Sequence, residues 1–151
     1  MSMTVTITRT KPEDIDVLST MFDEYRRFYK QPSDIEACRE FLSERIKTNQ
    51  SVAYIAYLEE RPAGFVHLYP TFSSIYLKRI WILNDLFVHS TARRQGVGFG
   101  LIDAAKKLAL ETNALCIKAS TGQSNFAAQQ VYESKDFRRD YQFFHYVMPF
   151  I

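Results

Sequence analysis

The sequence predicts a mixed α/β domain in which helices cover a central sheet. Two observations predict this class: short apolar runs typical of strands alternate along the chain with longer segments whose apolar residues recur at helical spacing. The expected order of elements is β-α-α-β-β-β-α-β-α-β. A length of 151 residues suits one domain over residues 1–151, and 46% hydrophobic residues are enough to build its core.

Six segments have the pattern of strands. Residues 4–8 alternate Val5 and Ile7 with threonines, whereas residues 51–58 are apolar on both faces. Residues 59–62 are expected to make a tight turn between this second segment and the third. The other four strands are expected at residues 63–69, 80–88, 115–119 and 143–148.

Four segments have the pattern of helices, and capping residues mark where the first two begin. Thr10 and Glu13 have the spacing of a capping box, and residues 32–36 repeat the pattern before the second helix. The fourth helix is expected at residues 125–134. The apolar stripes of the first three helices consist of Ile15, Leu18, Phe22, Tyr25 and Tyr29, then Cys38, Phe41, Leu42 and Ile46, then Leu101, Ile102, Ala105, Leu108 and Ala109.

Charge and composition exclude several classes of protein. The formal charge of +2, from 19 basic and 17 acidic side chains, provides no basic face for nucleic acid. No segment approaches the roughly 18 uninterrupted apolar residues of a membrane span, and residues 1–9 lack the pattern of a secretory signal. Cys38 and Cys116 are far apart and belong to no metal-binding motif. We therefore expect a soluble, cytoplasmic protein without disulfide or metal, and without nucleic-acid or membrane partners.

The most informative segment is the glycine-rich turn within residues 86–100, which joins an apolar strand to an amphipathic helix. It holds three of the chain's five glycines. The first turn of a helix leaves N–H groups unpaired, and glycines let that backbone approach a ligand closely. The segment therefore predicts an anion-binding site, to which Arg93 and Arg94 add positive charge. It has neither the ending of a P-loop nor the spacing of a dinucleotide site. The alternative is a helix start whose glycines serve only a tight turn.

These residues resemble the GCN5-related N-acetyltransferase (GNAT) superfamily. Residues 93–98, Arg-Arg-Gln-Gly-Val-Gly, match its acetyl-CoA signature Arg/Gln-x-x-Gly-x-Gly/Ala at every fixed position. Asp136 replaces the glycine of a second family motif, and Ser90 replaces a proline that is frequent before the turn. Residues 84–88 and 68–74 look most similar to the histone/polyamine acetyltransferase group and its bacterial relatives. The second motif, Asn-x-x-Ala-x-x-hydrophobe-Tyr-Glu-x-x-Gly-Phe, is matched by Asn125, Ala128, Val131, Tyr132, Glu133 and Phe137.

The resemblance implies a mostly antiparallel sheet that splays between its fourth and fifth strands, with acetyl-CoA bound at the opening. It implies that strand backbone pairs with the pantetheine amides and that the glycine-rich turn holds the phosphates. The residues that the resemblance assigns to acetyl-CoA are Leu86, Phe87, Val88, Arg93, Arg94, Gln95, Gly96, Val97, Gly98, Asn125 and Tyr132.

Acetyl transfer to an amine needs a base, because an alkylammonium with a pKa of about 10.4 is almost fully protonated at neutral pH. Asp85 is the first candidate for this base, and His67 and His89 are the alternatives. The departing thiolate needs a proton, which the motif position assigns to the Tyr132 hydroxyl. Each side chain also has a purely structural interpretation, Asp85 as a backbone-binding residue and Tyr132 as a core aromatic.

The acceptor side is less specific. Tyr29, Tyr69 and Phe72 are candidate substrate-binding residues, since an aromatic wall can hold a cationic amine or its carbon chain. The same spacing suits an ordinary core, which is the interpretation we favour for Tyr25. Acidic residues that could attract a polyamine are Asp23, Glu24 and Asp34.

The sequence thus predicts an N-acetyltransferase that moves an acetyl group from acetyl-CoA to a small, polyamine-like or protein amine by direct attack in a ternary complex. Neither cysteine lies near a base in a motif, so no covalent intermediate is expected. The alternative is an acyl-CoA-binding sensor without turnover. The aromatic residues 143–147 would leave an exposed apolar edge, which predicts a homodimer unless that strand is paired within the chain.

Overall fold

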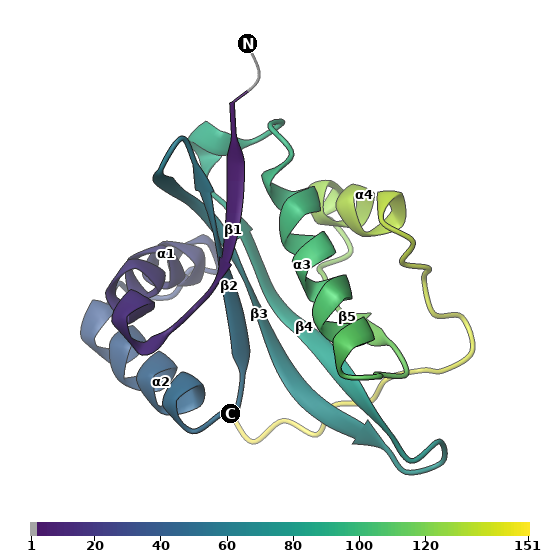
Figure 1. Cartoon of the computed structure of the whole chain (residues 1–151). Coiled ribbons are helices and arrows are strands. Elements are labelled where there is room, and N and C mark those ends of the chain that lie inside the picture. The colour runs from purple at the N-terminus through teal and green to yellow at the C-terminus, as the bar shows by residue number, and fades with distance from the viewer. Residues whose placement is uncertain (1–2) are drawn as a thin grey trace. The chain divides into compact units, whose positions relative to one another are not determined.

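The computed structural model describes residues 3–151 (Figure 1). The chain forms two compact units that divide between Ser120 and Thr121. The first unit contains a sheet flanked by helices. The second contains one further helix followed by an irregular segment.

The sheet of the first unit has five strands, which are β1 (Val5–Arg9), β2 (Val52–Leu58), β3 (Arg61–Ser73), β4 (Lys78–Val88) and β5 (Ile117–Ala119). Their order in space is the same as in the sequence. Neighbouring strands pair antiparallel, except β4 and β5, which pair in parallel. The prediction of a mixed, mostly antiparallel sheet is confirmed.

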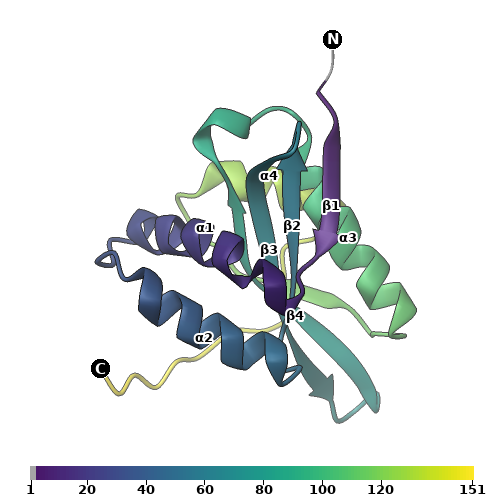
Figure 2. The ribbon, with the colours of Figure 1, turned by 60° about the vertical axis from the view of Figure 1, so that its left-hand side comes forward.

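Three α-helices cover this sheet, namely α1 (Ile15–Phe28), α2 (Ile35–Lys47) and α3 (Val97–Glu111). The helices α1 and α2 lie on one face and α3 on the other (Figure 1 and Figure 2). The core beneath α1 and α2 includes Leu18, Leu42 and Phe65, each with no exposed surface, and Leu101 of α3 is equally buried. Among residues 3–151, no helix is both long enough and apolar enough to cross a membrane.

The predicted capping box at Thr10 is wrong. The Thr10 N–H donates to Ala53 O of β2, so it is not available to the Glu13 side chain, as a capping box requires. The Lys11 N–H instead donates to Asp14 Oδ2 at 2.9 Å, within a short 3₁₀ turn, η1 (Pro12–Asp14), that precedes α1. The start of α2 agrees with its prediction, because Asp34 accepts a hydrogen bond from the first turn of that helix.

The turn predicted at residues 59–62 is confirmed, but it contains two residues and not four. Leu58 pairs with Arg61, and the intervening Glu59 and Glu60 have φ angles of 48° and 67°. Two left-handed residues are typical of a type I′ turn, whose twist matches that of the flanking strands.

The strands β3 and β4 form a longer hairpin than the sequence predicts. Residues 70–73 continue β3, and Phe72 pairs with Arg79 across the ladder. The Arg79 guanidinium lies 5.2 Å from the centre of the Phe72 ring. Cross-strand contacts of this kind stabilise a strand that local sequence alone does not indicate.

The second unit contains α4 (Phe126–Ser134), as predicted, with Asn125 as its N-cap. The strand predicted at residues 143–148 is wrong, because no residue between Lys135 and Ile151 lies in a strand. A strand needs a partner for its backbone hydrogen bonds, and the described residues of this unit form none. Its aromatic side chains are exposed instead, with Phe144 at 89% and Tyr146 at 90%.

Candidate active site

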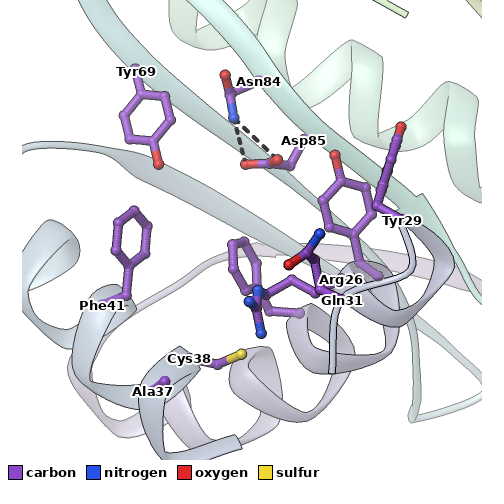
Figure 3. A pocket seen from close by; sticks show the side chains of 11 residues that line it. Arg26, Tyr29, Gln31, Ala37, Cys38, Phe41, Tyr69, Asn84 and Asp85 are labelled. Atoms are coloured by element: carbon purple, nitrogen blue, oxygen red, sulfur yellow. Dashed lines mark hydrogen bonds between the residues drawn. The ribbon is translucent and has the colours of Figure 1, made fainter. Parts of the chain in front are cut away.

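A cavity of about 510 Å³ opens where α1 and α2 approach β3 and β4 (Figure 3). This volume is within the range of small-molecule sites. Five aromatic residues line it, namely Phe22, Tyr25, Tyr29, Phe41 and Tyr69. Its polar and charged lining residues are Arg26, Gln31, Asn84 and Asp85.

Asp85 reaches the cavity because β4 carries a bulge. His67 of β3 pairs with Asp85, whereas the next residue, Leu68, pairs with Leu83, so Asn84 has no partner on β3. An extra residue of this kind bends the strand and redirects neighbouring side chains. It leaves Asn84 exposed and places Asp85, which is 6% exposed, directly beside His67.

A buried hydrogen-bond chain runs from Asp85 through His67 to Ser51. His67 Nδ1 lies 2.9 Å from Asp85 Oδ2, and His67 Nε2 lies 2.7 Å from Ser51 Oγ. An ionised carboxylate only accepts, so this network assigns the proton to Nδ1, which donates to Asp85, while Nε2 accepts from the Ser51 hydroxyl. Asn84 Nδ2 adds contacts of 3.1 Å to both carboxylate oxygens. The carboxylate is therefore oriented from two sides.

Asp85 also acts on two tyrosines in the cavity wall. Burial and the negative charge of Asp85 raise the pKa of Tyr69 to about 12, and the same two causes raise the pKa of Tyr25. Both phenols keep their proton at neutral pH. The two tyrosine hydroxyls can therefore donate hydrogen bonds to a ligand. Asp85 is the only carboxylate among the lining residues, so it is the lining group that can accept a proton.

The third candidate base, His89, lies outside the lining of this cavity. Its Nε2 is 3.4 Å from Glu24 Oε1, and its Nδ1 is 2.9 Å from Thr91 Oγ1. His89 thereby caps the 3₁₀ turn η2 (Ser90–Ala92). Of the three candidates, the structure brings together Asp85 and His67.

The glycine-rich turn adopts a conformation that suits an anion. Gly96 has a φ angle of 84° and immediately precedes α3, and Arg94 is also left-handed, with φ of 65°. A Cβ atom on Gly96 would meet nothing within 4 Å, so open space lies beside this backbone. The first helical hydrogen bond joins Gly100 N to Gly96 O, and the amides before it can point to a ligand. With Arg93 exposed as well, the residues fit a phosphate group.

The strand β4 loses its second partner before the turn begins. Its pairs with β5 involve only residues 81–83, whereas its pairs with β3 continue to Val88. Within the described chain, no strand pairs with the other edge of residues 84–88. The sheet therefore splays between β4 and β5, as predicted, and the open edge fits a ligand with its own amide groups.

Gly64 of β3 is a positioning residue that the motifs do not reveal. A Cβ atom at this position would lie 2.3 Å from Phe87 O, so a larger residue would push β4 away. Gly64 thus keeps the candidate donor-binding strand in register with β3. The available signal was an isolated glycine inside a strand pattern, which often marks a close backbone approach.

In the second unit, Tyr132 lies on α4 and its ring contacts that of Phe137, with centroids 5.2 Å apart. Two residues after the end of this helix, Asp136 lies in the left-handed region, with φ of 70°. The N–H groups on either side of it, of Lys135 and Phe137, both bond to Tyr132 O. This conformation explains why the motif has glycine here, and aspartate is among the side chains that tolerate it.

The predicted substrate-binding residues divide into two groups. Tyr29 and Tyr69 line the cavity, but Phe72 does not: it is 68% exposed and rests against Arg79. Tyr25 belongs to the core, as expected, with its ring 5.6 Å from that of Phe65. Tyr25 also lines the cavity, so it is both a core residue and a residue that a bound ligand can contact.

Arg26 and Gln31 line the cavity although no motif contains them. Phe22, Tyr25, Arg26 and Tyr29 are spaced three, four and seven residues apart, which puts them on one face of α1. The helical period of the aromatic stripe thus points to Arg26 as well. Gln31 follows the helix in a loop, where no periodic signal exists.

Asp23, which the sequence offers as an acidic residue that could attract a polyamine, is buried, with 2% of its surface exposed. It accepts hydrogen bonds from Ser33 Oγ at 2.8 Å and from Asp34 N at 2.7 Å. Burial raises the pKa of Asp23, but these hydrogen bonds and the charges of Arg27 and Arg26 outweigh burial, so the pKa is lowered. Asp23 therefore holds the loop between α1 and α2.

Known proteins are similar to this chain in sequence and in fold. A family model described as the acetyltransferase (GNAT) family matches residues 18–137. The chain is 40% identical over 142 residues to the uncharacterized N-acetyltransferase YhfO of Bacillus subtilis, covering 94% of this chain and 95% of that protein. It is 33% identical over 126 residues to a probable acetyltransferase of Haemophilus influenzae, covering 83% and 84%. The crystal structure of a probable acetyltransferase matches with a TM-score of 0.92 and 44% identity over 97% of this chain and 98% of that one.

Proposed function

This chain belongs to the acetyltransferase (GNAT) family, and on that premise we propose that it transfers an acetyl group from acetyl-CoA to a primary amine bound beside Asp85. One observation carries this choice of site. The carboxylate that lines the cavity is buried, is hydrogen-bonded to His67, and stands on the strand that leads into the glycine-rich turn. A base and an anion-binding turn thus follow one another in one stretch of chain.

The acetyl donor is proposed to bind along residues 86–88 and at the turn of residues 93–98. The open edge of β4 supports pairing with the pantetheine amides, and the left-handed Gly96 beside two exposed arginines supports a phosphate site. Asn125 and Tyr132 complete the proposed set. When bound, acetyl-CoA supplies the acetyl group as an activated thioester.

The chain's own part in the reaction is to move protons. Asp85 accepts a proton from the ammonium group of the acceptor, which frees the nitrogen lone pair for the new N–C bond. His67 orients the carboxylate through its Nδ1–H, and Ser51 in turn orients His67. The Tyr132 hydroxyl gives a proton to the sulfur as the C–S bond breaks, and the nitrogen releases its second proton to solvent. Exchange with solvent then restores both Asp85 and Tyr132.

Direct transfer, without an acyl-enzyme, is part of the proposal. Cys38 is the one thiol in the cavity wall. It is 2% exposed, and burial raises its pKa despite the opposing charge of Arg26. A thiol of this kind has little thiolate character at neutral pH, which argues against its acting as a nucleophile.

The proposal is tested by coenzyme A release in the presence of a panel of primary amines. Asp85→Asn is expected to lower kcat/KM by about 10²-fold or more while the affinity for acetyl-CoA stays unchanged. Asp16→Asn is the matched control, since the Asp16 side chain is 79% exposed. Tyr132→Phe is expected to lower kcat, with Tyr76→Phe, at a 65% exposed position, as its control.

Two results would contradict the proposal. If acetyl-CoA raises the melting temperature but no amine stimulates release, the chain is an acyl-CoA sensor. If Asp85→Asn keeps full activity, the base lies elsewhere.

We also propose that the chain forms a homodimer through residues 141–151, and that it acts in the cytoplasm. The exposed side chains of this segment support an interface, because large contiguous apolar surfaces are uncommon on monomers; Phe143, Phe144, Tyr146, Val147, Met148 and Phe150 are each at least 69% exposed. Light scattering is expected to give twice the mass of the chain. A double substitution, Phe144→Asp with Tyr146→Asp, is expected to give the monomer, and a monomeric wild-type protein would refute the interface.

A further inference from the structure

The acceptor cavity has two opposite charges in its wall. Among its lining residues, only Arg26 and Asp85 are charged. Arg26 stands on the last turn of α1, and Asp85 stands on β4, so one charge comes from the helical wall and the other from the sheet (Figure 3). A molecule that fills the cavity meets both.

The Arg26 guanidinium has donors to spare. Its Nη1 makes a long contact of 3.4 Å to Pro32 O, and among residues 3–151 no carboxylate forms an ion pair with it. The carboxylate of Asp23 pairs with Arg27 instead, at 3.4 Å. A guanidinium has five N–H donors in a fixed fork, so most of them remain for a ligand. Its charge also reaches the cavity wall, where it lowers the pKa of Cys38 against the larger effect of burial.

We infer that the acceptor is an amino acid-like molecule, whose amine faces Asp85 and whose carboxylate is bound by Arg26. This inference rests on the proposed function and specifies its substrate class. A guanidinium matches the two oxygens of a carboxylate in geometry and charge. A polyamine is disfavoured, because its second ammonium group would be brought toward the positive charge of Arg26.

The wall of the cavity is otherwise mostly aromatic, which suits a carbon chain that joins the two charged groups. Tyr29 and Tyr69 are partly exposed and carry hydroxyl groups, while Phe22 and Phe41 provide apolar surface. Aromatic faces bind methylene groups and stabilise a nearby ammonium ion. The expected acceptor is therefore an ω-amino acid or the side-chain amine of a free amino acid.

The test compares ω-amino acids with their carboxamides, which have the same length and the same amine but lack the negative charge of the carboxylate. The probes are β-alanine, γ-aminobutyrate, δ-aminovalerate and ε-aminocaproate, each beside its carboxamide. At the best chain length, the wild-type kcat/KM for the acid is expected to exceed that for the amide by about tenfold to a hundredfold, through KM. Arg26→Gln is expected to bring the ratio close to one by slowing only the acid. Arg27→Gln, which removes the same charge from the next residue of α1, is expected to preserve the ratio.

A second measurement separates this inference from the proposed function. The melting temperature with coenzyme A present is expected to rise more with the acid than with the amide, and Arg26→Gln is expected to abolish the difference. If no probe is acetylated but this difference is present, the proposed function fails and the carboxylate subsite stands. If amides are acetylated as well as acids, or if the ratio survives Arg26→Gln, the subsite is refuted and the proposed function stands.

Discussion

Replacing His67 separates its hydrogen bond to Asp85 from its hydrogen bond to Ser51. An asparagine side chain places its amide nitrogen near the position of Nδ1, whereas a glutamine side chain reaches the position of Nε2. His67→Asn therefore keeps a donor for Asp85, and His67→Gln keeps only a partner for Ser51. The two variants form a matched pair with similar polarity in the same buried space.

The magnitude follows from burial. His67 has no exposed surface and Asp85 is 6% exposed, so water cannot replace a donor that is lost. A hydrogen bond to a charged group contributes about 1.5–3 kcal/mol, and about 1.4 kcal/mol corresponds to a tenfold change in rate. In His67→Gln, which no longer holds the carboxylate, kcat/KM at neutral pH is therefore expected to fall by about tenfold to a hundredfold. In His67→Asn it is expected to stay close to the wild-type value.

The assay is kcat/KM for one amine at neutral pH, with urea unfolding as the control for folding. Each variant loses one buried hydrogen bond, which is expected to lower the free energy of unfolding by about 1–3 kcal/mol, within a typical total of about 5–15 kcal/mol. Equal kcat/KM values for a folded His67→Gln and the wild type would show that His67 does not act on Asp85. Equal losses of kcat/KM in both variants would attribute the effect to lost packing.

Three further predictions concern the turn, the end of α4 and the loop between α1 and α2. Gly96→Ala is expected to weaken the binding of coenzyme A, measured by calorimetry, and to lower the free energy of unfolding by about 1 kcal/mol, because alanine is strained at a φ of 84° although its methyl group has room. Gly100→Ala, inside α3, is the control. Equal affinities of Gly96→Ala and the wild type for coenzyme A would refute the role of the turn. Asp136→Gly is expected to raise the free energy of unfolding by about 1 kcal/mol, because glycine removes the strain at a φ of 70°; a decrease in urea unfolding would contradict this. The folded-state pKa of Asp23 lies below its ordinary value of 3.8, so its contribution to stability is complete above that pH and is lost as the pH falls through the folded-state pKa. Asp23→Asn is expected to be less stable at neutral pH and to lose less stability on acidification, and parallel pH curves for the two proteins would be inconsistent with this role.

Local patterns account for the parts of the molecule that depend on neighbouring residues. The apolar period placed α1 to α4 and the first five strands, and the glycines predicted a turn between β4 and α3. The second motif marked the end of α4, where Asp136 adopts the conformation that glycine favours. Two errors also have local origins. Thr10 has the spacing of a cap but bonds to β2, and residues 143–148 have the composition of a strand but no partner.

The sequence by itself determined the family, the order of the helices and strands up to α4, and the glycine-rich turn before α3, because helical period, strand alternation and glycine conformation are properties of short stretches of chain. Only the tertiary structure decided the composition of the cavity. The bulge at Asn84 sets the register that joins His67 and Asp85, and the packing of α1 places Arg26 in the same cavity wall. These contacts link residues far apart in the chain. They depend on strand register and helix packing, which no local pattern specifies.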